Sequence, residues 1–91
     1  MVLKLYAIKD TVQGEFMNPF LMRNKEEAKR AFGIAINSGN KGTSIVDFYK
    51  DMQLFELGEY NNITGDTTSK VEFVCTGLDV KVVLEEVKEE V

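Results

Sequence analysis

Histidine and tryptophan are absent from this sequence of 91 residues, and cysteine and proline occur once each. The absence of histidine removes the most common general base near neutral pH, and with it the usual catalytic triads and most zinc sites. The single cysteine, Cys75, cannot form a disulfide within the chain, so we expect a buried packing residue in a reducing compartment. We therefore expect no metal, no cofactor and no enzymatic activity.

Long apolar runs and phosphate-binding motifs are also missing. No segment approaches the roughly 18 apolar residues of a membrane-spanning helix, and the first residues lack the basic and then apolar layout of a signal peptide. The glycines of residues 39–44 follow a predicted helix, whereas a phosphate-binding loop precedes one. Adjacent glutamates on a helix diverge by about 100° and cannot converge on one substrate atom. We expect a protein that stays where it is made.

The charges that are present are divided unevenly along the chain. Residues 1–50 hold eight Lys or Arg against five Asp or Glu, net +3, while residues 51–91 hold three against ten, net -7, which together give -4. A chain of 91 residues fits one domain, residues 1–91, and so small a domain would gain stability from a partner. Because the whole chain is acidic, any binding of nucleic acid must be local to a basic patch.

Two apolar segments occupy the first quarter of the sequence. Apolar residues alternate on both sides of residues 2–9, which predicts a strand at the centre of a sheet. Residues 15–22 form a second apolar run that Asn18 and Pro19 interrupt. Because proline removes a backbone donor, this second run is predicted to be a loop or an irregular edge strand.

A helix is predicted to begin at Lys25. Asn24 and Glu27 have the spacing of a cap, in which the asparagine oxygen accepts a backbone N–H and the glutamate reaches back. Residues 38–40 predict its end, with Gly39 able to adopt a positive φ. The predicted buried face consists of Ala28, Ala31, Phe32, Ala35 and Ile36.

The second half of the chain predicts an antiparallel hairpin. Residues 45–50 are expected to form a short helical turn, followed by strands at residues 52–57 and 71–76 with a hairpin loop at residues 61–66. The order β-(β)-α-β-β-α predicts an α+β fold in which an antiparallel sheet of three to four strands is packed by one central helix, with a C-terminal amphipathic helix in addition.

The last residues, 79–91, form a possible oligomerisation or partner-binding tail. Asp79 is predicted to cap a final helix, although a strand is the rival interpretation because valine is β-branched and Val80 and Val82 alternate. An apolar stripe of this helix either pairs with a second copy or lies against the sheet. The stripe consists of Val80, Val83, Leu84, Val87 and Val91.

Basic residues gather around the predicted central helix. They either contact phosphate or form a solvated face in which Glu26 pairs with Lys29 or Arg30. Phe16 and Phe20 likewise either stack on bases, as in single-strand binders, or belong to the core. The basic candidates are Arg23, Lys25, Lys29, Arg30 and Lys41.

Three segments together resemble the small nonstructural protein of gokushoviruses, which are single-stranded DNA phages of the microvirus group. The segments are residues 4–10, residues 19–24 leading into 27–33, and residues 51–60 with Thr64 and Gly65. The resemblance spans about residues 3–66, and it implies a DNA-binding protein of the host cell cytoplasm that helps switch genome replication toward single strands. Within the matching segments, it points first to Arg23 and Arg30.

We therefore expect a non-enzymatic phage accessory protein, homodimeric, that binds single-stranded DNA through the basic end of the central helix. The alternative is a protein-binding regulator or scaffold whose acidic tail and valine stripe engage a host or viral protein.

Overall fold

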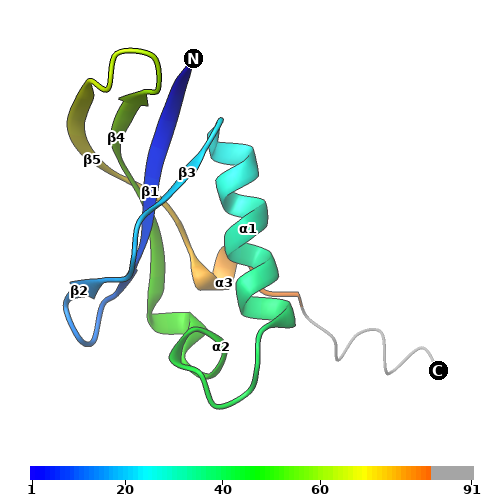
Figure 1. The fold of residues 1–91 in the computed structure, drawn as a ribbon. Helices are drawn as coiled ribbons and strands as arrows, with labels where there is room; N and C mark the ends of the chain where they lie inside the picture. Colours follow the sequence, from blue (N-terminus) through cyan, green and yellow to red (C-terminus); the bar gives the residue numbers. More distant parts are fainter. Residues whose placement is uncertain (83–91) are drawn as a thin grey trace.

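The computed structural model describes residues 1–82, which form a small α+β fold (Figure 1). No helix within these residues is long and apolar enough to cross a membrane. The elements in chain order are β1 (Val2–Asp10), β2 (Glu15–Phe16), β3 (Phe20–Met22), α1 (Lys25–Ser38), α2 (Ser44–Asp47), the 3-10 turn η1 (Tyr49–Asp51), β4 (Met52–Asn61), β5 (Thr67–Thr76) and α3 (Gly77–Val80).

The central strand of the sheet is β1, as the alternation of residues 2–9 predicts. The strands lie in the order β2-β1-β4-β5, β3 also pairs with β1, and all pairs are antiparallel. The sheet has five strands where three to four were expected, because the run interrupted at Pro19 supplies two short strands, β2 and β3.

The first turn of α1 confirms most of the predicted cap. The Asn24 side chain accepts a hydrogen bond from the Glu27 N–H at 2.9 Å. The Glu27 carboxylate reaches back one residue further than expected, to the Arg23 N–H at 3.2 Å. The first bond satisfies a backbone donor that the start of a helix leaves without an intrahelical partner, and the second holds the residue that precedes the cap.

The core lies between α1 and one face of the sheet. Ala28, Phe32 and Ile36 of α1 are buried, as their spacing predicts. They pack against five buried residues of the sheet, which are Tyr6, Ile8, Met52, Leu54 and Cys75. Cys75 is a free thiol in this core, and burial and then Asp79 raise its pKa.

The end of α1 differs from the prediction. Gly39 has φ -73° and ψ 171°, which is extended backbone and not the left-handed conformation. A Cβ at this position would collide with the Ala35 carbonyl oxygen and press on the Val46 side chain. Glycine is therefore required here for close approach, as the chain turns back toward α2.

The hairpin of β4 and β5 is longer than predicted. Residues 67–70 are polar and resemble a loop in sequence, but they pair with β4 as far as Tyr60. The register shifts at Gly58, where φ is 145° and a Cβ would collide with the Thr68 carbonyl oxygen. A bulge of this kind interrupts the alternation of side chains along β4, so a period-two pattern does not continue past it.

The predicted cap of the final helix is wrong. Thr76 is the N-cap of α3, and Asp79 forms a reciprocal capping box with it. The helix ends at Val80, and Asn37 of α1 holds the chain there, donating to the Val80 carbonyl at 2.9 Å and accepting from the Val82 N–H at 3.0 Å. Val80 packs against the core. Val83, Leu84, Val87 and Val91 lie outside the described residues.

Substitution of alanine at two glycines is expected to change the free energy of unfolding in opposite directions. Gly33 lies inside α1, and in Gly33→Ala the new Cβ would meet the Val80 side chain at 3.5 Å, an ordinary contact distance. We therefore expect the free energy of unfolding to rise by about 0.5–1 kcal/mol, because alanine has the higher helix propensity. In Gly77→Ala, the Cβ would collide with the Tyr49 carbonyl oxygen, so we expect a loss of about 1–3 kcal/mol. Urea unfolding followed by circular dichroism measures both. A stable Gly77→Ala variant would contradict the packing of α3 against η1.

Candidate functional site

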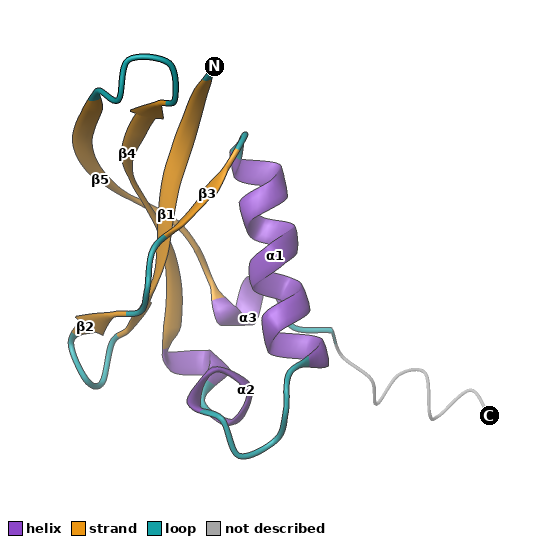
Figure 2. Cartoon of the chain, viewed as in Figure 1, coloured by secondary structure: helices purple, strands orange, loops and turns teal. Residues whose placement is uncertain are grey.

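The sheet has one covered face and one open face. Helices α1 and α3 lie on the same side of the sheet, and no described element covers the opposite side (Figures 1 and 2). Paired residues of antiparallel strands project to the same face. Tyr6 and Glu56 are paired across β1 and β4 on the covered face, whereas Ala7, Phe55 and Phe73 are paired across β1, β4 and β5 on the open face.

Three phenylalanines form a row across the open face. The rings of Phe16 and Phe55 lie 5.4 Å apart at 78°, and those of Phe55 and Phe73 lie 5.8 Å apart at 74°. Lys9 Nζ lies 5.4 Å from the centre of the Phe16 ring. Phe16 and Phe73 remain 43% and 54% exposed. We call these three side chains the phenylalanine row.

Aliphatic side chains extend this apolar surface. Leu21 pairs with Leu5 on β1, and Val71 lies two residues before Phe73 on β5, so both project to the open face. Leu21 and Val71 are exposed. Exposed apolar side chains that gather on one face of a sheet indicate a candidate binding surface.

Phe16 and Phe20 lie on opposite faces of the sheet, and only Phe20 belongs to the core. Phe20 pairs with Tyr6 on the covered face, where the rings stack with centres 6.1 Å apart, and it packs against the core. Phe16 lies on the open face. Phe55 and Phe73 were not predicted as surface residues because the apolar side of a strand is ordinarily the buried one, whereas here the charged Glu56 and Glu72 lie on the covered face.

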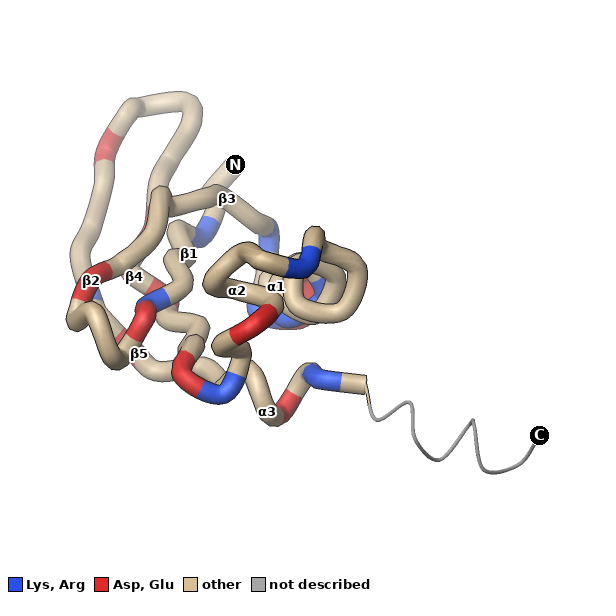
Figure 3. Tube along the Cα trace, turned by 90° about the horizontal axis from the view of Figure 1, so that it is seen from below, with Lys and Arg blue, Asp and Glu red and all other residues tan. Residues whose placement is uncertain are grey.

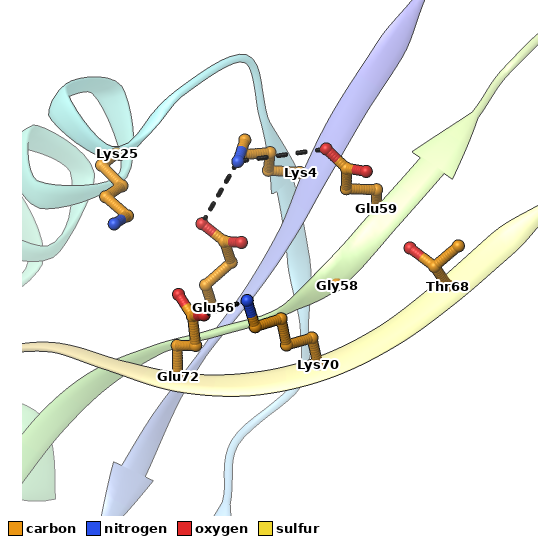
Figure 4. Close-up of a pocket in the computed structure, with 8 residues that line it drawn as sticks. All are labelled: Lys4, Lys25, Glu56, Gly58, Glu59, Thr68, Lys70 and Glu72. Atoms are coloured by element: carbon orange, nitrogen blue, oxygen red, sulfur yellow. Dashed lines mark ion pairs between the residues drawn. The ribbon is translucent and has the colours of Figure 1, made fainter.

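A charged pocket of about 270 Å³ occupies the covered face beyond the start of α1 (Figure 4). Lys4 Nζ lies 3.6 Å from Glu56 and 4.0 Å from Glu59, and Lys70 Nζ lies 2.8 Å from Glu72. Glu56 is only 6% exposed. The pocket is lined by Lys4, Lys25, Glu56, Gly58, Glu59, Thr68, Lys70 and Glu72.

The Tyr6 hydroxyl is buried next to this pocket. It has no hydrogen-bond partner among the described residues, and Tyr6 has no exposed surface. Burial, and then the charge of Glu56, raise the pKa of Tyr6 to about 12.

Four of the five predicted basic residues lie together at the first half of α1. Arg23 forms a bidentate pair with Glu27, with Nη2 2.8 Å from one carboxylate oxygen, and this hydrogen bonding lowers the pKa of Glu27. Lys29 Nζ lies 4.0 Å from Glu26, as the solvated alternative predicts. Lys25 lies at the rim of the pocket, and Arg30 is exposed.

The structure does not bring Lys41 to this group. It follows the opposite end of α1. Basic and acidic residues are interspersed along the trace (Figure 3), and Lys4 of the basic half pairs with Glu56 and Glu59 of the acidic half. The charge polarity of the sequence is therefore partly neutralised within the fold.

Comparison with known proteins gives one family match. Residues 3–80 match the family described as Phage ORF5 protein, and this match covers nearly all of β1 and every later described element through α3. No curated protein and no solved structure matches the chain.

Removal of the Tyr6 hydroxyl is expected to leave stability near neutral pH within about 1 kcal/mol, because this buried group has no partner to lose. The folded state raises the pKa of Tyr6 from 10.0 to about 12 and so favours the protonated form. Its contribution is therefore fully present below pH 10 and is lost as the pH rises through about 12. Urea unfolding of the wild type and Tyr6→Phe between pH 7 and 12 measures this. A parallel alkaline loss in both proteins would contradict the assignment.

Proposed function

The chain belongs to the Phage ORF5 protein family, and from that premise we propose that it is a non-enzymatic phage accessory protein that binds single-stranded DNA. Its role is in genome replication or in the switch to single-strand synthesis, as the resemblance to gokushovirus proteins implies. The observation that carries the proposal is the phenylalanine row on the open face.

Stacking is the interaction that such a row offers. Proteins that bind single strands without sequence preference stack successive bases on aromatic side chains, at about 1–3 kcal/mol per base. Phe16 and Phe73 are half-exposed at the two ends of the row, with Phe55 between them. Bases can therefore reach the face without any rearrangement of the described elements.

Phosphate contacts must be local, because the net charge of the chain is -4. Lys9 lies beside Phe16 and is the cation placed next to the row. The basic residues of α1 lie on the other side of the sheet, so they form a second and separate candidate surface. Variants of the two surfaces therefore test two distinct modes of contact.

A protein partner is the second candidate. The aliphatic neighbours of the row, Leu21 and Val71, favour it because an apolar protein surface can bury them, whereas bases stack on the rings. Pull-down from infected cells discriminates the two candidates, with the full chain compared with a chain that lacks residues 83–91 and so keeps α3 and its contacts. Loss of every partner on truncation, with no DNA bound at low salt, would favour a protein-binding regulator.

Loss of the two outer rings is expected to weaken DNA binding. For Phe16→Ala with Phe73→Ala, we expect the dissociation constant for a fluorescent thymidine oligonucleotide to rise about tenfold or more, since each stacked base contributes about 1–3 kcal/mol. Fluorescence anisotropy at low salt measures it. Phe48→Ala is the matched control, because Phe48 is 59% exposed but lies between α2 and η1. An equal loss of DNA affinity in the Phe16→Ala, Phe73→Ala variant and in the Phe48→Ala control would contradict a role for the phenylalanine row.

Two arginines of α1 are expected to differ in their effect on salt dependence. Each phosphate contact to a single strand contributes about -0.7 to the slope of log affinity against log salt. Arg30→Ala should reduce the slope by about that amount, whereas Arg23→Ala should change it less, because Glu27 already holds Arg23. Titrations at several salt concentrations measure both slopes. Unchanged DNA binding in a variant that carries both Arg23→Ala and Arg30→Ala would exclude this surface of α1 as a DNA contact.

A further inference from the structure

The two edges of the sheet differ in how they are protected against further pairing. One edge consists of β2 and β3, which are only two and three residues long and flank Pro19. Short strands and proline both prevent the addition of another strand. The other edge is β5, which has ten residues, no proline and, among residues 1–82, a strand partner on one side only (Figure 2). The long edge of β5 is therefore the one that is open to pairing.

This edge also exposes apolar side chains. Residues 67–71 are all exposed, Val71 by 61%, and Phe73 is exposed by 54%. The backbone N–H and C=O groups along an unpaired edge are a template for another strand. Because Val71 and Phe73 project to the open face, a strand added here would cover apolar surface and also satisfy backbone groups.

The charges of β5 indicate which strand fits. Lys70 and Glu72 are its two charged residues, they lie on either side of Val71, and both line the covered face. Figure 4 shows the two side chains next to each other, with Lys70 Nζ 2.8 Å from the Glu72 carboxylate. A strand with one positive and one negative charge around a central residue complements an antiparallel copy of itself, because reversal brings each charge opposite the other sign.

We propose that β5 pairs with β5 of a second copy of this chain, antiparallel, about a two-fold axis at Val71. Lys70 of each copy then lies opposite Glu72 of the other copy, and the two Val71 side chains face each other on the open face. Opposite charges on directly paired residues stabilise two strands, whereas like charges destabilise them. Because the same patch serves both copies, the contact is a closed dimer and not a growing chain.

The charges also select the register. In a two-fold antiparallel pair, residues that project to the same face lie opposite each other, so the axis passes through one residue of β5. An axis at Lys70 would bring two lysines together, and an axis at Glu72 would bring two glutamates together. Val71 is the axis position that pairs both charges with the opposite sign.

The pairing joins two sheets into one. Both α1 helices then lie on one side of the joined sheet, and both phenylalanine rows lie on the other. An edge strand contributes fewer residues than the roughly 20–30 per side of a standard interface, so we expect a dimer that dissociates in the micromolar range. The pairing itself does not depend on DNA. A single strand that extends across both rows is a consequence that rests on the proposed function.

Charge reversal tests the register. Lys70→Glu leaves negative charges alone at the pairing and Glu72→Lys leaves positive ones alone, so each variant should raise the dissociation constant of the dimer about tenfold or more. In an equimolar mixture of the two variants, every cross-strand pair has opposite charges again, so mixed dimers should form. Lys41→Glu is the matched control, because Lys41 is exposed and follows the far end of α1. Sedimentation velocity of the full chains at several concentrations, without DNA, measures all of these.

A cross-link tests the axis independently of the charges. Paired residues of antiparallel strands have Cα atoms about 4.5–5.5 Å apart, within the range of a disulfide. Val71→Cys should therefore form a covalent dimer with oxidised glutathione. Ser69→Cys, the matched control, should not, because Ser69 lies opposite Phe73 of the other copy. The native Cys75 is buried. Electrophoresis without reducing agent measures the covalent dimer.

A chain that stays monomeric at every concentration would overturn the pairing and leave the proposed function intact. A charge-dependent dimer that binds no DNA would support the pairing and overturn the proposed function. A dimer that neither reversal weakens, or a mixture of the reversed variants that stays monomeric, would overturn the pairing. A monomer that dimerises only when residues 83–91 are deleted would assign the edge to the chain's own last residues and overturn the second copy as its partner. The cross-link decides the matter even if a reversed variant fails to fold.

Discussion

The packing of α1 against one face of the sheet is the constraint on which the rest of the structure depends. Phe32 and Ile36 bury their side chains in one cluster with Tyr6 and Ile8 of β1, and the other strands contribute Met52, Leu54 and Cys75 to this cluster. One helix of 14 residues can cover only part of one face. The polar pocket beyond its start and the apolar face behind the sheet both follow from that geometry.

The basic and acidic halves of the sequence do not remain separate once the chain folds. Lys4, from the basic half, lies beside β4 of the acidic half and pairs with Glu56 and Glu59. Arg23 is neutralised within its own helix by Glu27. Within residues 1–82, part of the basic half is therefore neutralised by carboxylates, and the surface also exposes the outer rings of the phenylalanine row.

The elements that the sequence predicts well are those with a local physical signal. The cap at Asn24, the buried spacing of Ala28, Phe32 and Ile36, and the two-sided alternation of β1 each depend on neighbours within a few residues. Residues 67–70 of β5 are different, because their strand conformation comes from pairing with β4 across the bulge at Gly58. The final helix was predicted too late in the chain, since Thr76 and Asp79 both have the chemistry of an N-cap, and in the structure Thr76 is the cap while Asp79 is its partner in the capping box.

The candidate site was less accessible to sequence reasoning for a similar reason. Phe55 and Phe73 become a surface only because no described element covers the open face, and Glu56 becomes a pocket residue only because Gly58 and Lys70 lie around it. Lysines and arginines stand out in a sequence by residue type alone, whereas the fold distinguishes those that a carboxylate of residues 1–82 holds from the others.

The burial of Cys75 has a practical consequence. Its side chain lies in the core, and its pKa is raised, so little of the reactive thiolate forms near neutral pH. We therefore expect Cys75 to react little with thiol-directed labels in the native protein. A cysteine introduced on the open face would carry a spin label or a fluorophore selectively, and the dye would report directly on what approaches the phenylalanine row.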